Sequence, residues 1–274
     1  MENDIQFTIV TVCKNEKSKI VKTIESVIQQ DYANMEYLII DGASEDGTKE
    51  IIWRYAQKDK RIKVISEPDD GIYNAMNKAI SLAKGDYINF MNAGDSFTRA
   101  NVLGKVDVIL RKRYPDILCG EAIFYATEDL CKQGVNFHKK VTILRMENKG
   151  KLSCTKVLRG IWGCHQAVFA KKDTLRQYYF NEKYKIVADY DWFVRNIKDK
   201  REIEYNSIKV CNFIGDGISW KSENASILAK ENDAVVRQHY GIVFAYIRRF
   251  IKWYRKSNMK KWKTILIKYL KRKI

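Results

Sequence analysis

The first hundred residues alternate between short apolar runs and segments with helical spacing. Residues 7–12, 35–40, 62–66 and 87–91 are rich in β-branched, aliphatic and aromatic side chains, which is typical of buried strands. Between these runs, apolar residues recur three and four positions apart, which predicts amphipathic helices. Strands that alternate with helices favour a parallel sheet covered on both faces, and therefore an α/β fold. The clearest helical pattern is formed by Ile72, Met76, Ala79, Ile80 and Ala83.

The pattern is less regular after residue 101. Apolar spacing predicts a helix over 102–110, and the run at 116–125 predicts another strand, whereas residues 126–160 are polar and irregular. Regular patterning returns at GIWGCHQAVF (160–169), and a helix is expected to open near Asp189. The glycines of residues 215–224 fit either a mobile loop or an ordinary surface turn.

Acidic residues follow several of the predicted strands. In parallel sheets, ligands bind beyond the carboxyl ends of the strands, where residues 14–16, Asp41, 67–70 and 92–95 should gather. Carboxylates at one edge repel each other unless a cation or a hydrogen-bond-donating ligand binds there. The pattern therefore predicts a ligand site at this edge.

Five segments, in matching order within residues 5–220, resemble a bacterial family 2 glycosyltransferase of the GT-A fold. The resemblance implies a Rossmann-like, mostly parallel sheet flanked by helices. It also implies transfer of a sugar from a nucleotide diphosphate donor, usually of uridine, with inversion at the anomeric carbon and assistance from Mn²⁺ or Mg²⁺. The nucleotide-binding half would cover about residues 1–115 and the acceptor-binding half about 116–239. The segments are TVCKNE, SVIQQDYANMEYLIIDGASEDGT, EPDDGIYNAMNKAISLAKGDYINFMNAGDSF, CHQAVF and ADYDWFVR.

The metal motif of that fold is Asp-any-Asp, and here only its last acid is kept in Asn92, Ala93, Gly94 and Asp95. Magnesium and manganese are commonly held by one or two carboxylates together with substrate phosphates. The resemblance therefore makes Asp95 the main metal ligand, and Gly94 would let the backbone approach the ligand closely. A turn residue that caps the following helix is the simpler alternative for Asp95.

The resemblance also suggests a nucleotide site. Asp41 matches the acid that accepts the imino hydrogen of the base, although it could equally be a turn or capping residue. Asn77 matches a donor contact, or it lines an exposed helix face. The residues that match the nucleotide-sugar site are Val12, Lys14, Glu16, Asp41, Asp70, Asn77, Lys78, Asn92, Ala93 and Gly94.

The catalytic base of the family is the acid of a Glu-Asp pair that opens a helix. The matching residues are Ala188 and Asp189, with a further acid at Asp191, so Asp189 is the expected base. Asp191 is the competing choice, unless it only stabilises the helix dipole. His165 and Gln166 match the acceptor side of the cleft; metal ligation, acceptor contact and packing are equal alternatives for His165.

Composition narrows the class of protein. A chain of 274 residues with 46% hydrophobic and 30% charged residues and two prolines fits a folded globular protein. It has no apolar run of about 18 residues and no signal-peptide pattern, which favours a cytoplasmic location. Six cysteines without a C-x-x-C pair argue against a zinc site or a disulfide framework.

The net charge of +17 is concentrated in residues 240–274. This segment contains twelve Lys or Arg and no acid, which leaves +5 for residues 1–239. Its apolar residues have helical spacing, so a basic amphipathic helical tail on an anionic membrane is predicted. The first stripe could instead pack on the catalytic domain or on a second subunit of a homodimer. The stripes are Val243, Ile247, Phe250 and Tyr254, then Trp262, Leu266, Tyr269 and Leu270.

The alternative function is a nucleic-acid-binding or other nucleotide-binding α/β protein without transferase activity. No nucleic-acid module, G-x-G-x-x-G motif or P-loop is found, and the basic residues lie outside the acidic edge. The resemblance therefore favours a protein that binds no nucleic acid and assembles a surface polysaccharide, such as O-antigen, capsule or exopolysaccharide. It would act on a lipid-linked saccharide, peripherally on the inner face of the cell membrane.

Overall fold

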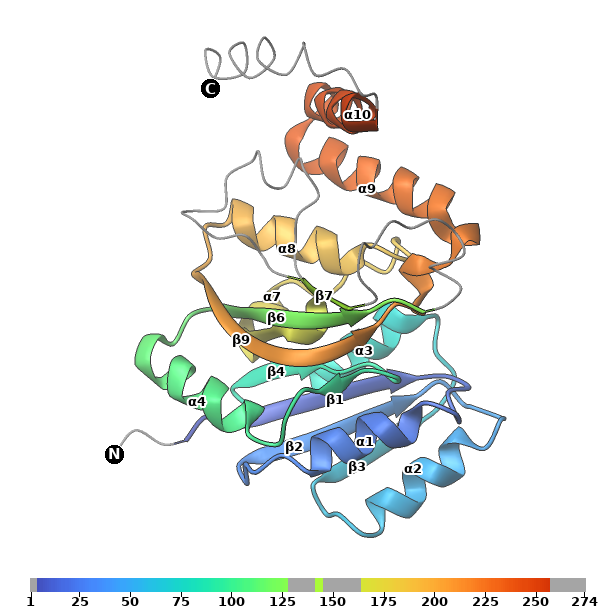
Figure 1. The fold of residues 1–274 in the computed structure, drawn as a ribbon, viewed down its shortest axis with the longest axis vertical. Helices are drawn as coiled ribbons and strands as arrows, with labels where there is room; N and C mark the ends of the chain where they lie inside the picture. The colour runs from blue at the N-terminus through green and yellow to red at the C-terminus, as the bar shows by residue number, and fades with distance from the viewer. Residues whose placement is uncertain (1–3, 128–140, 145–163, 257–274) are drawn as a thin grey trace.

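The computed structural model describes residues 4–127, 141–144 and 164–256. The strands of these residues form one sheet with the order β3-β2-β1-β4-β8-β6-β9-β5, and β7 pairs with β6 (Figure 1). The strands are β1 (Phe7–Cys13), β2 (Met35–Asp41), β3 (Ile62–Ser66), β4 (Tyr87–Phe90), β5 (Ser96–Phe97), β6 (Ile117–Tyr125), β7 (Val141–Leu144), β8 (Val168–Lys171) and β9 (Ile203–Ile214).

The N-terminal half has the predicted parallel arrangement. β1 pairs in parallel with β2 and β4, and β2 pairs in parallel with β3. The first four strands agree with the sequence prediction to within one residue at each end. Their side chains alternate between two cores, because Val10 and Val12 pack towards α3 whereas Phe7 and Ile9 pack towards α1. The connecting helices are α1 (Ile20–Ile28), α2 (Thr48–Ala56) and α3 (Ile72–Leu82).

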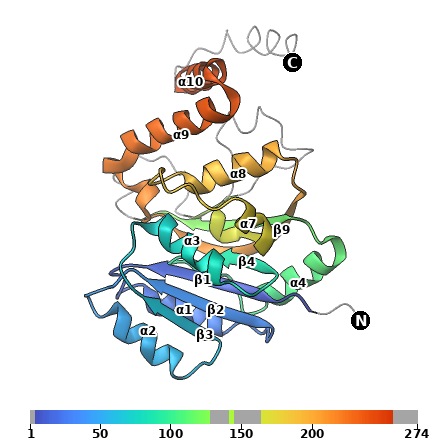
Figure 2. The same ribbon diagram turned by 180° about the vertical axis from the view of Figure 1, so that it is seen from behind.

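Both faces of the sheet are covered by helices. α1 and α2 lie on the face towards the viewer in Figure 1, and α3 lies on the opposite face, in front in Figure 2. α4 (Val102–Arg113) packs through Val102, Leu103, Val106 and Leu110 into the core that contains α1. The predicted α/β class and the GT-A-like arrangement of helices around the sheet are thus present.

The C-terminal half of the sheet is mixed rather than parallel. β8 is antiparallel to β4 and β6, β9 is parallel to β6, and β5 is antiparallel to β9. The predicted strand at 116–125 is β6, whereas β5 and β9 were not predicted from the sequence. Residues 128–140 and 145–163, most of the irregular segment noted above, lie outside the described residues.

Three helices lie in successive layers beyond the sheet (Figures 1 and 2). α8 (Ala188–Lys198) follows a short helix α7 (Lys172–Gln177) and opens where the sequence predicted a helix. α9 (Ala225–Tyr240) contacts α8, and α10 (Ile242–Lys256) contacts α9. Gly241, with a φ of +86°, makes the turn between α9 and α10. No helix within the described ranges is long and apolar enough to cross a membrane.

α10 shows that a helix begins the basic tail and leaves part of the predicted stripe exposed. Its inner face is formed in part by Arg248, which is only 2% exposed and packs with Ala245 towards α9. Val243 and Phe250 of the stripe are 64% and 45% exposed. The Tyr254 side chain and the second stripe (Trp262, Leu266, Tyr269, Leu270) lie outside the described residues. Arg248 also makes an ion pair with Asp233 of α9.

Candidate active site

The carboxyl ends of the parallel strands meet at one edge, as predicted. Cys13 and Asp41 are paired across β1 and β2, and Asp41 is paired with Ser66 across β2 and β3. The Met91 N–H continues the pairing beyond β4 by donating to the Val10 carbonyl at 2.8 Å. The turn with Asp95 therefore follows directly from the central pair of strands.

The turn after β4 presents Gly94 in a conformation that favours glycine. Its φ is +100°, and an added Cβ would lie 3.3 Å from Cδ of Lys19. The Lys19 ammonium group in turn lies 2.8 Å from Asp216 and 3.2 Å from Glu16. Lys19 was not singled out from the sequence, because a lone lysine before a helix carries no distinctive signal.

Asp95 points into the protein at the end of this turn. Its Oδ1 accepts a hydrogen bond from the Ile214 backbone N–H at 3.0 Å, and its Oδ2 accepts one from Gln166 Nε2 at 2.7 Å. Only 5% of the residue is exposed. Burial raises the pKa of Asp95 to about 7, although these two hydrogen bonds act in the opposite direction. Asp95 therefore joins the end of β4 to β9 and to the segment before β8.

His165 lies between the two acidic segments. Its Nδ1 is 3.1 Å from Asp189 Oδ2, and its Nε2 is 3.0 Å from Asn92 Nδ2. The short 3-10 turn His165–Ala167, which leads into β8, also carries Gln166. The adjacent His165 and Gln166 therefore contact the predicted base and the predicted metal ligand, respectively.

Asp189 sits in the first turn of α8 with two hydrogen-bond donors on its carboxylate. Besides His165, the Tyr190 N–H donates to Oδ1 at 2.7 Å. The Tyr73 hydroxyl lies 3.3 Å from the same oxygen, but it donates its one hydrogen to the Ile186 carbonyl at 2.7 Å. Its side chain remains 13% exposed. Tyr73 was not singled out from the sequence, and its aromatic ring belongs to the apolar core.

Asp191 has a different environment. Its side chain is 0% exposed, with Arg195 Nε 2.9 Å from Oδ2 and His239 Nε2 2.7 Å from Oδ1. Arg195 lies one turn further along α8, whereas His239 belongs to α9. Asp191 therefore links α8 to α9 in the protein interior, without access to solvent.

Asp41 is buried at the end of β2, surrounded by hydroxyl groups. The Ser44 hydroxyl donates to Oδ1, and the Ser66 hydroxyl and the Ser44 N–H donate to Oδ2. Next to it, an added Cβ on Gly42 would lie 2.4 Å from Asp69 Oδ2 and 3.2 Å from Cδ of Lys14. Asp69 is thus the acid that faces this position.

The other predicted residues of the nucleotide wall are distributed around Asp41. Val12 is buried within β1, Glu16 is part-buried, and Lys14 and Asp70 are exposed. The sequence favoured Asp70 within the Asp69-Asp70 pair, and only the fold distinguishes which of two adjacent acids faces Gly42. Ala93 is half-buried in the turn before Asp95.

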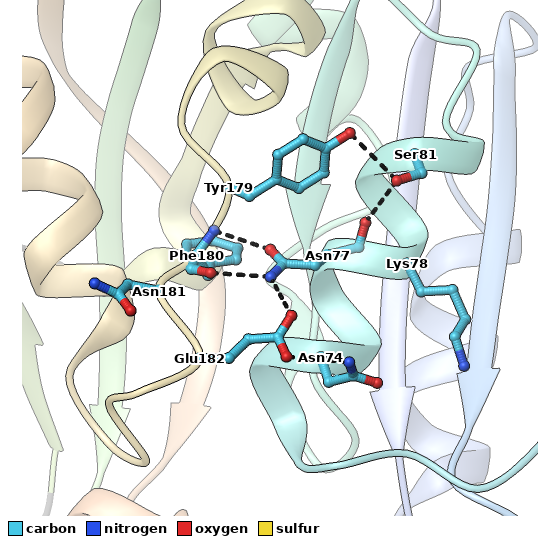
Figure 3. Close-up of a pocket in the computed structure, with 8 residues that line it drawn as sticks. All are labelled: Asn74, Asn77, Lys78, Ser81, Tyr179, Phe180, Asn181 and Glu182. Carbon is cyan, nitrogen blue, oxygen red and sulfur yellow. Dashed lines mark hydrogen bonds between the residues drawn. The ribbon is translucent and has the colours of Figure 1, made fainter.

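Asn77 and Lys78 lie on the outer side of α3, as Figure 3 shows. The Asn77 amide exchanges hydrogen bonds with the backbone of Phe180 and donates to Glu182 at 2.7 Å. Lys78 pairs with Glu67 at 2.5 Å. These contacts line an open groove of about 530 Å³ between α3 and residues 179–182, and they join the two segments. The structure does not bring Asn77 next to Asp95 or Asp189.

The predicted metal ligands do not form a ready metal site. Both oxygens of Asp95 and both ring nitrogens of His165 already have protein partners. Among the described residues, no group of three His, Cys, Asp or Glu side chains is arranged to hold a metal ion. The residues present therefore do not fit a preformed metal centre, and any metal would need ligands from the substrate.

Comparisons with known proteins agree with this fold. The family model described as Glycosyl transferase family 2 matches residues 8–128, which include β1 to β6 and the acidic edge. A PGL/p-HBAD biosynthesis glycosyltransferase of Mycobacterium bovis is 28% identical over 69% of this chain and 68% of its own length. The amylovoran biosynthesis glycosyltransferase AmsB of Erwinia amylovora is 27% identical over 70% of this chain and 64% of its own length.

Two solved structures share the fold at low sequence identity. S. aureus TarS 1-349 in complex with UDP-GlcNAc matches with a TM-score of 0.65 at 16% identity, over 86% of this chain and 68% of that chain. The mannosyltransferase PcManGT from Pyrobaculum calidifontis, in complex with GDP-Man and Mn²⁺, matches with a TM-score of 0.58 at 16% identity, over 97% and 69%. These similarities extend the common fold beyond residue 128.

Proposed function

We propose that this chain, whose residues 8–128 match the family model described as Glycosyl transferase family 2, is an inverting enzyme of that family that moves a hexosyl or N-acetylhexosaminyl group from a nucleotide diphosphate sugar to an acceptor hydroxyl. UDP-sugars are the expected donors, and a lipid-linked saccharide is the expected acceptor. The product would enter a cell-surface polysaccharide such as O-antigen, capsule or exopolysaccharide. The relatives named as biosynthesis glycosyltransferases support this assignment.

The environment of Asp189 is the observation that carries the proposal. It combines partial exposure, a position at the end of the sheet near Asn92, and two donors that fix its carboxylate. A general base needs this combination of access and orientation. Asp191, which is 0% exposed and enclosed by Arg195 and His239, lacks the access, which supports Asp189 as the base.

In the proposed reaction, Asp189 accepts the proton of the acceptor hydroxyl as that oxygen attacks the anomeric carbon. The attack comes from the side opposite the diphosphate, so the new C–O bond forms as the bond to the diphosphate oxygen breaks and the configuration inverts. His165 and the Tyr190 N–H keep the carboxylate in place during this transfer. Fixing the reacting groups in this way lowers the entropic cost of reaching the transition state.

We place the nucleotide along Val12, Lys14, Glu16, Asp41 and Asp70, with Asp41 accepting the uracil imide hydrogen. Asp41 is 0% exposed, it accepts three hydrogen bonds from Ser44 and Ser66, and the Cys13 thiol lies 3.8 Å from its Oδ1. The base would therefore reach Asp41 by displacing one of these partners. UDP should then bind more tightly than CDP or GDP by on the order of 1 to 3 kcal/mol. Calorimetric titration that found GDP to bind more tightly would contradict the assignment of Asp41.

Mn²⁺ or Mg²⁺ is the expected cofactor from the family and from the neighbour whose title names Mn²⁺. Because Asp95 and His165 are both engaged with protein partners, no step of the reaction is assigned to a metal. Loss of UDP release after EDTA treatment, with recovery on addition of Mn²⁺, is the result expected of a metal-dependent enzyme.

We also propose that the protein works in the cytoplasm, peripherally on the inner face of the membrane that carries the acceptor. Residues 240–274 would provide the contact through their basic and apolar residues. A second subunit is the alternative occupant of the apolar face of α10, and no nucleic acid is expected as a partner.

Release of UDP tests the proposal directly. The purified protein is first screened with UDP-glucose, UDP-galactose and UDP-N-acetylglucosamine for protection against thermal unfolding, because a bound ligand stabilises the folded state. The best donor is then used to measure UDP release with and without Mn²⁺. Protection followed by slow hydrolysis supports a transferase. Protection without any turnover, in water or with saccharide acceptors, would favour a nucleotide-binding protein without transferase activity.

A further inference from the structure

His165 connects two parts of the site that are far apart in the sequence. It lies 73 residues after Asn92 and 24 residues before Asp189, yet its two ring nitrogens contact one residue of each segment. The imidazole is 24% exposed, so it is neither a fully buried core residue nor a solvated surface residue. Such a position indicates a role in holding these segments together.

Both ring nitrogens of His165 are engaged with protein side chains. An ionised Asp189 can only accept hydrogen bonds, so Nδ1 of His165 donates across the 3.1 Å contact. Nε2 lies 3.0 Å from the side-chain amide of Asn92, which is its second partner.

We propose that His165 is a positioning residue for the general base: it holds Oδ2 of Asp189 and ties the base to the Asn92 turn next to the donor site. This inference rests on the proposed function of Asp189. The other donor, the Tyr190 N–H, reaches Oδ1, so His165 is the donor that fixes Oδ2. Without it, the carboxylate could rotate about its Cβ–Cγ bond.

Gln166, the residue next to His165, anchors the same turn to its surroundings. Its side chain donates to Asp95 at 2.7 Å, and its backbone carbonyl accepts a hydrogen bond from Asn89 Nδ2 at 2.9 Å. The backbone that carries His165 is thus attached to β4 and to the turn that follows it. A rigid attachment is what a positioning residue needs, since a shift of about 1 Å in a reacting group can cost roughly a hundredfold in rate.

The substitutions His165→Asn and His165→Gln test separately the contacts made by Nδ1 and by Nε2 of His165. Asn places an amide near the position of Nδ1 and can still donate to Asp189, whereas the longer Gln reaches the position of Nε2 and Asn92. The UDP-sugar that gives the greatest thermal protection serves as the donor, and UDP release by hydrolysis is measured, because water needs the same base. We expect His165→Ala and His165→Gln to lower kcat by about 10- to 100-fold with donor KM within about twofold, and His165→Asn to recover most of the rate.

A second comparison tests whether His165 acts through Asp189. In the Asp189→Asn background, the further change His165→Ala should have almost no effect on the remaining rate, because the group that it positions is gone. Equal fold-losses in the two backgrounds would overturn the inference. Unchanged hydrolysis by His165→Ala would overturn it as well, and would favour an acceptor contact.

If His165 were a metal ligand or only a packing residue, the same variants would give different results. A metal ligand would raise the Mn²⁺ concentration needed for half-maximal rate, and a packing role would lower the melting temperature with equal activity losses in the Asn and Gln variants. Either result would overturn the inference. Failure of the proposed function is distinguishable, since wild-type protein would then release no UDP, or Asp189→Asn would be fully active.

Discussion

At the scale of single residues, the two acids of α8 have separate tasks. The Asp189 side chain accepts a hydrogen bond from His165 and is partly exposed to solvent, whereas the Asp191 side chain is fully buried against Arg195 and His239. The sequence placed both in the first turn of one helix, and helix spacing alone could not separate them. The separation arises because α9, some fifty residues later, brings His239 against Asp191.

Asp191→Ala should therefore reduce stability. Removing one partner of a buried ionic group typically costs about 3 to 5 kcal/mol, because the remaining charges stay buried without compensation. Urea unfolding monitored by circular dichroism would measure the loss. Asp189→Asn is the matched control: it should change the free energy of unfolding by about 1 kcal/mol or less while abolishing most turnover. The opposite pattern would show that the two roles are exchanged.

The raised pKa of Asp95 should make the stability of the protein depend on pH. Its pKa is raised from 3.8 to about 7 by burial, so the folded protein keeps a proton on Asp95 over a range where the unfolded chain has lost it. Between these pKa values the folded state binds more protons, and the contribution of Asp95 to the free energy of unfolding falls as pH rises.

Asp95→Asn tests this because Asn resembles the protonated acid and does not titrate. In urea unfolding with EDTA present, the free energy difference between Asn variant and wild type should move in favour of the variant by on the order of 2 to 3 kcal/mol from pH 5 to pH 8. The contributions of the other titrating groups are the same in both proteins, so they cancel from the difference in the free energy of unfolding. Parallel pH profiles would mean that Asp95 is ionised throughout.

At the scale of elements, the turn between β4 and β5 depends on Gly94. Its φ of +100° and the 3.3 Å approach to Lys19 both disfavour a side chain. Gly94→Ala should destabilise the protein by about 1 to 2 kcal/mol. Gly104, inside α4 with open space around it, is the control, and Gly104→Ala should stabilise by roughly 0.5 to 1 kcal/mol. Similar effects of both changes on the urea midpoint would contradict this account.

The elements that the sequence predicted are those whose pattern is local. β1 to β4 are short apolar runs, because strands covered on both faces need apolar side chains at nearly every position. β5 has two residues and exists through its pairing with β9, which lies more than a hundred residues later. β9 is largely half-exposed, so it lacks a continuous apolar run. Non-local pairing of this kind leaves no periodic signal in the sequence.

The contacts within the candidate site were likewise not predictable from local sequence patterns. Motif resemblance selected Asp189, His165 and Asn92 separately, but their contacts depend on how β8 and α8 pack against β4. Asp69 and Asp70 are adjacent and chemically identical, so only the backbone of the turn decides which one faces Gly42. Residue types were therefore predictable, whereas the partner of each residue was not.

At the scale of the whole molecule, the C-terminal helices form a continuous connection from the active site to the exposed face of α10. Asp191 joins α8 to His239 of α9, and Asp233 of α9 joins Arg248 of α10. Arg248 also lies over the ring of Tyr190, the residue next to Asp189. A surface bound through α10 would thus be held at a fixed distance from the proposed base.

The outer face of α10 is apolar at four exposed positions. It belongs to a segment with twelve basic residues and no acid, so an anionic membrane offers both apolar burial and electrostatic attraction. A second copy of this basic surface would be repelled, which disfavours a homodimer through this face. The exposed apolar residues are Ile242, Val243, Tyr246 and Phe250.

The double variant Val243→Glu with Phe250→Glu tests membrane binding without removing the buried Arg248. It should lose at least about tenfold in affinity for vesicles of mixed anionic and neutral lipid, because two apolar contacts are replaced by charges that anionic lipid repels. Val108→Glu, at a position on α4 that is also exposed, is the matched control and should bind almost as wild type does. All three proteins should bind UDP equally. Equal co-sedimentation of the double variant and the wild type would exclude α10 as the membrane contact, and a shift from dimer to monomer in the double variant would identify a second copy as its partner.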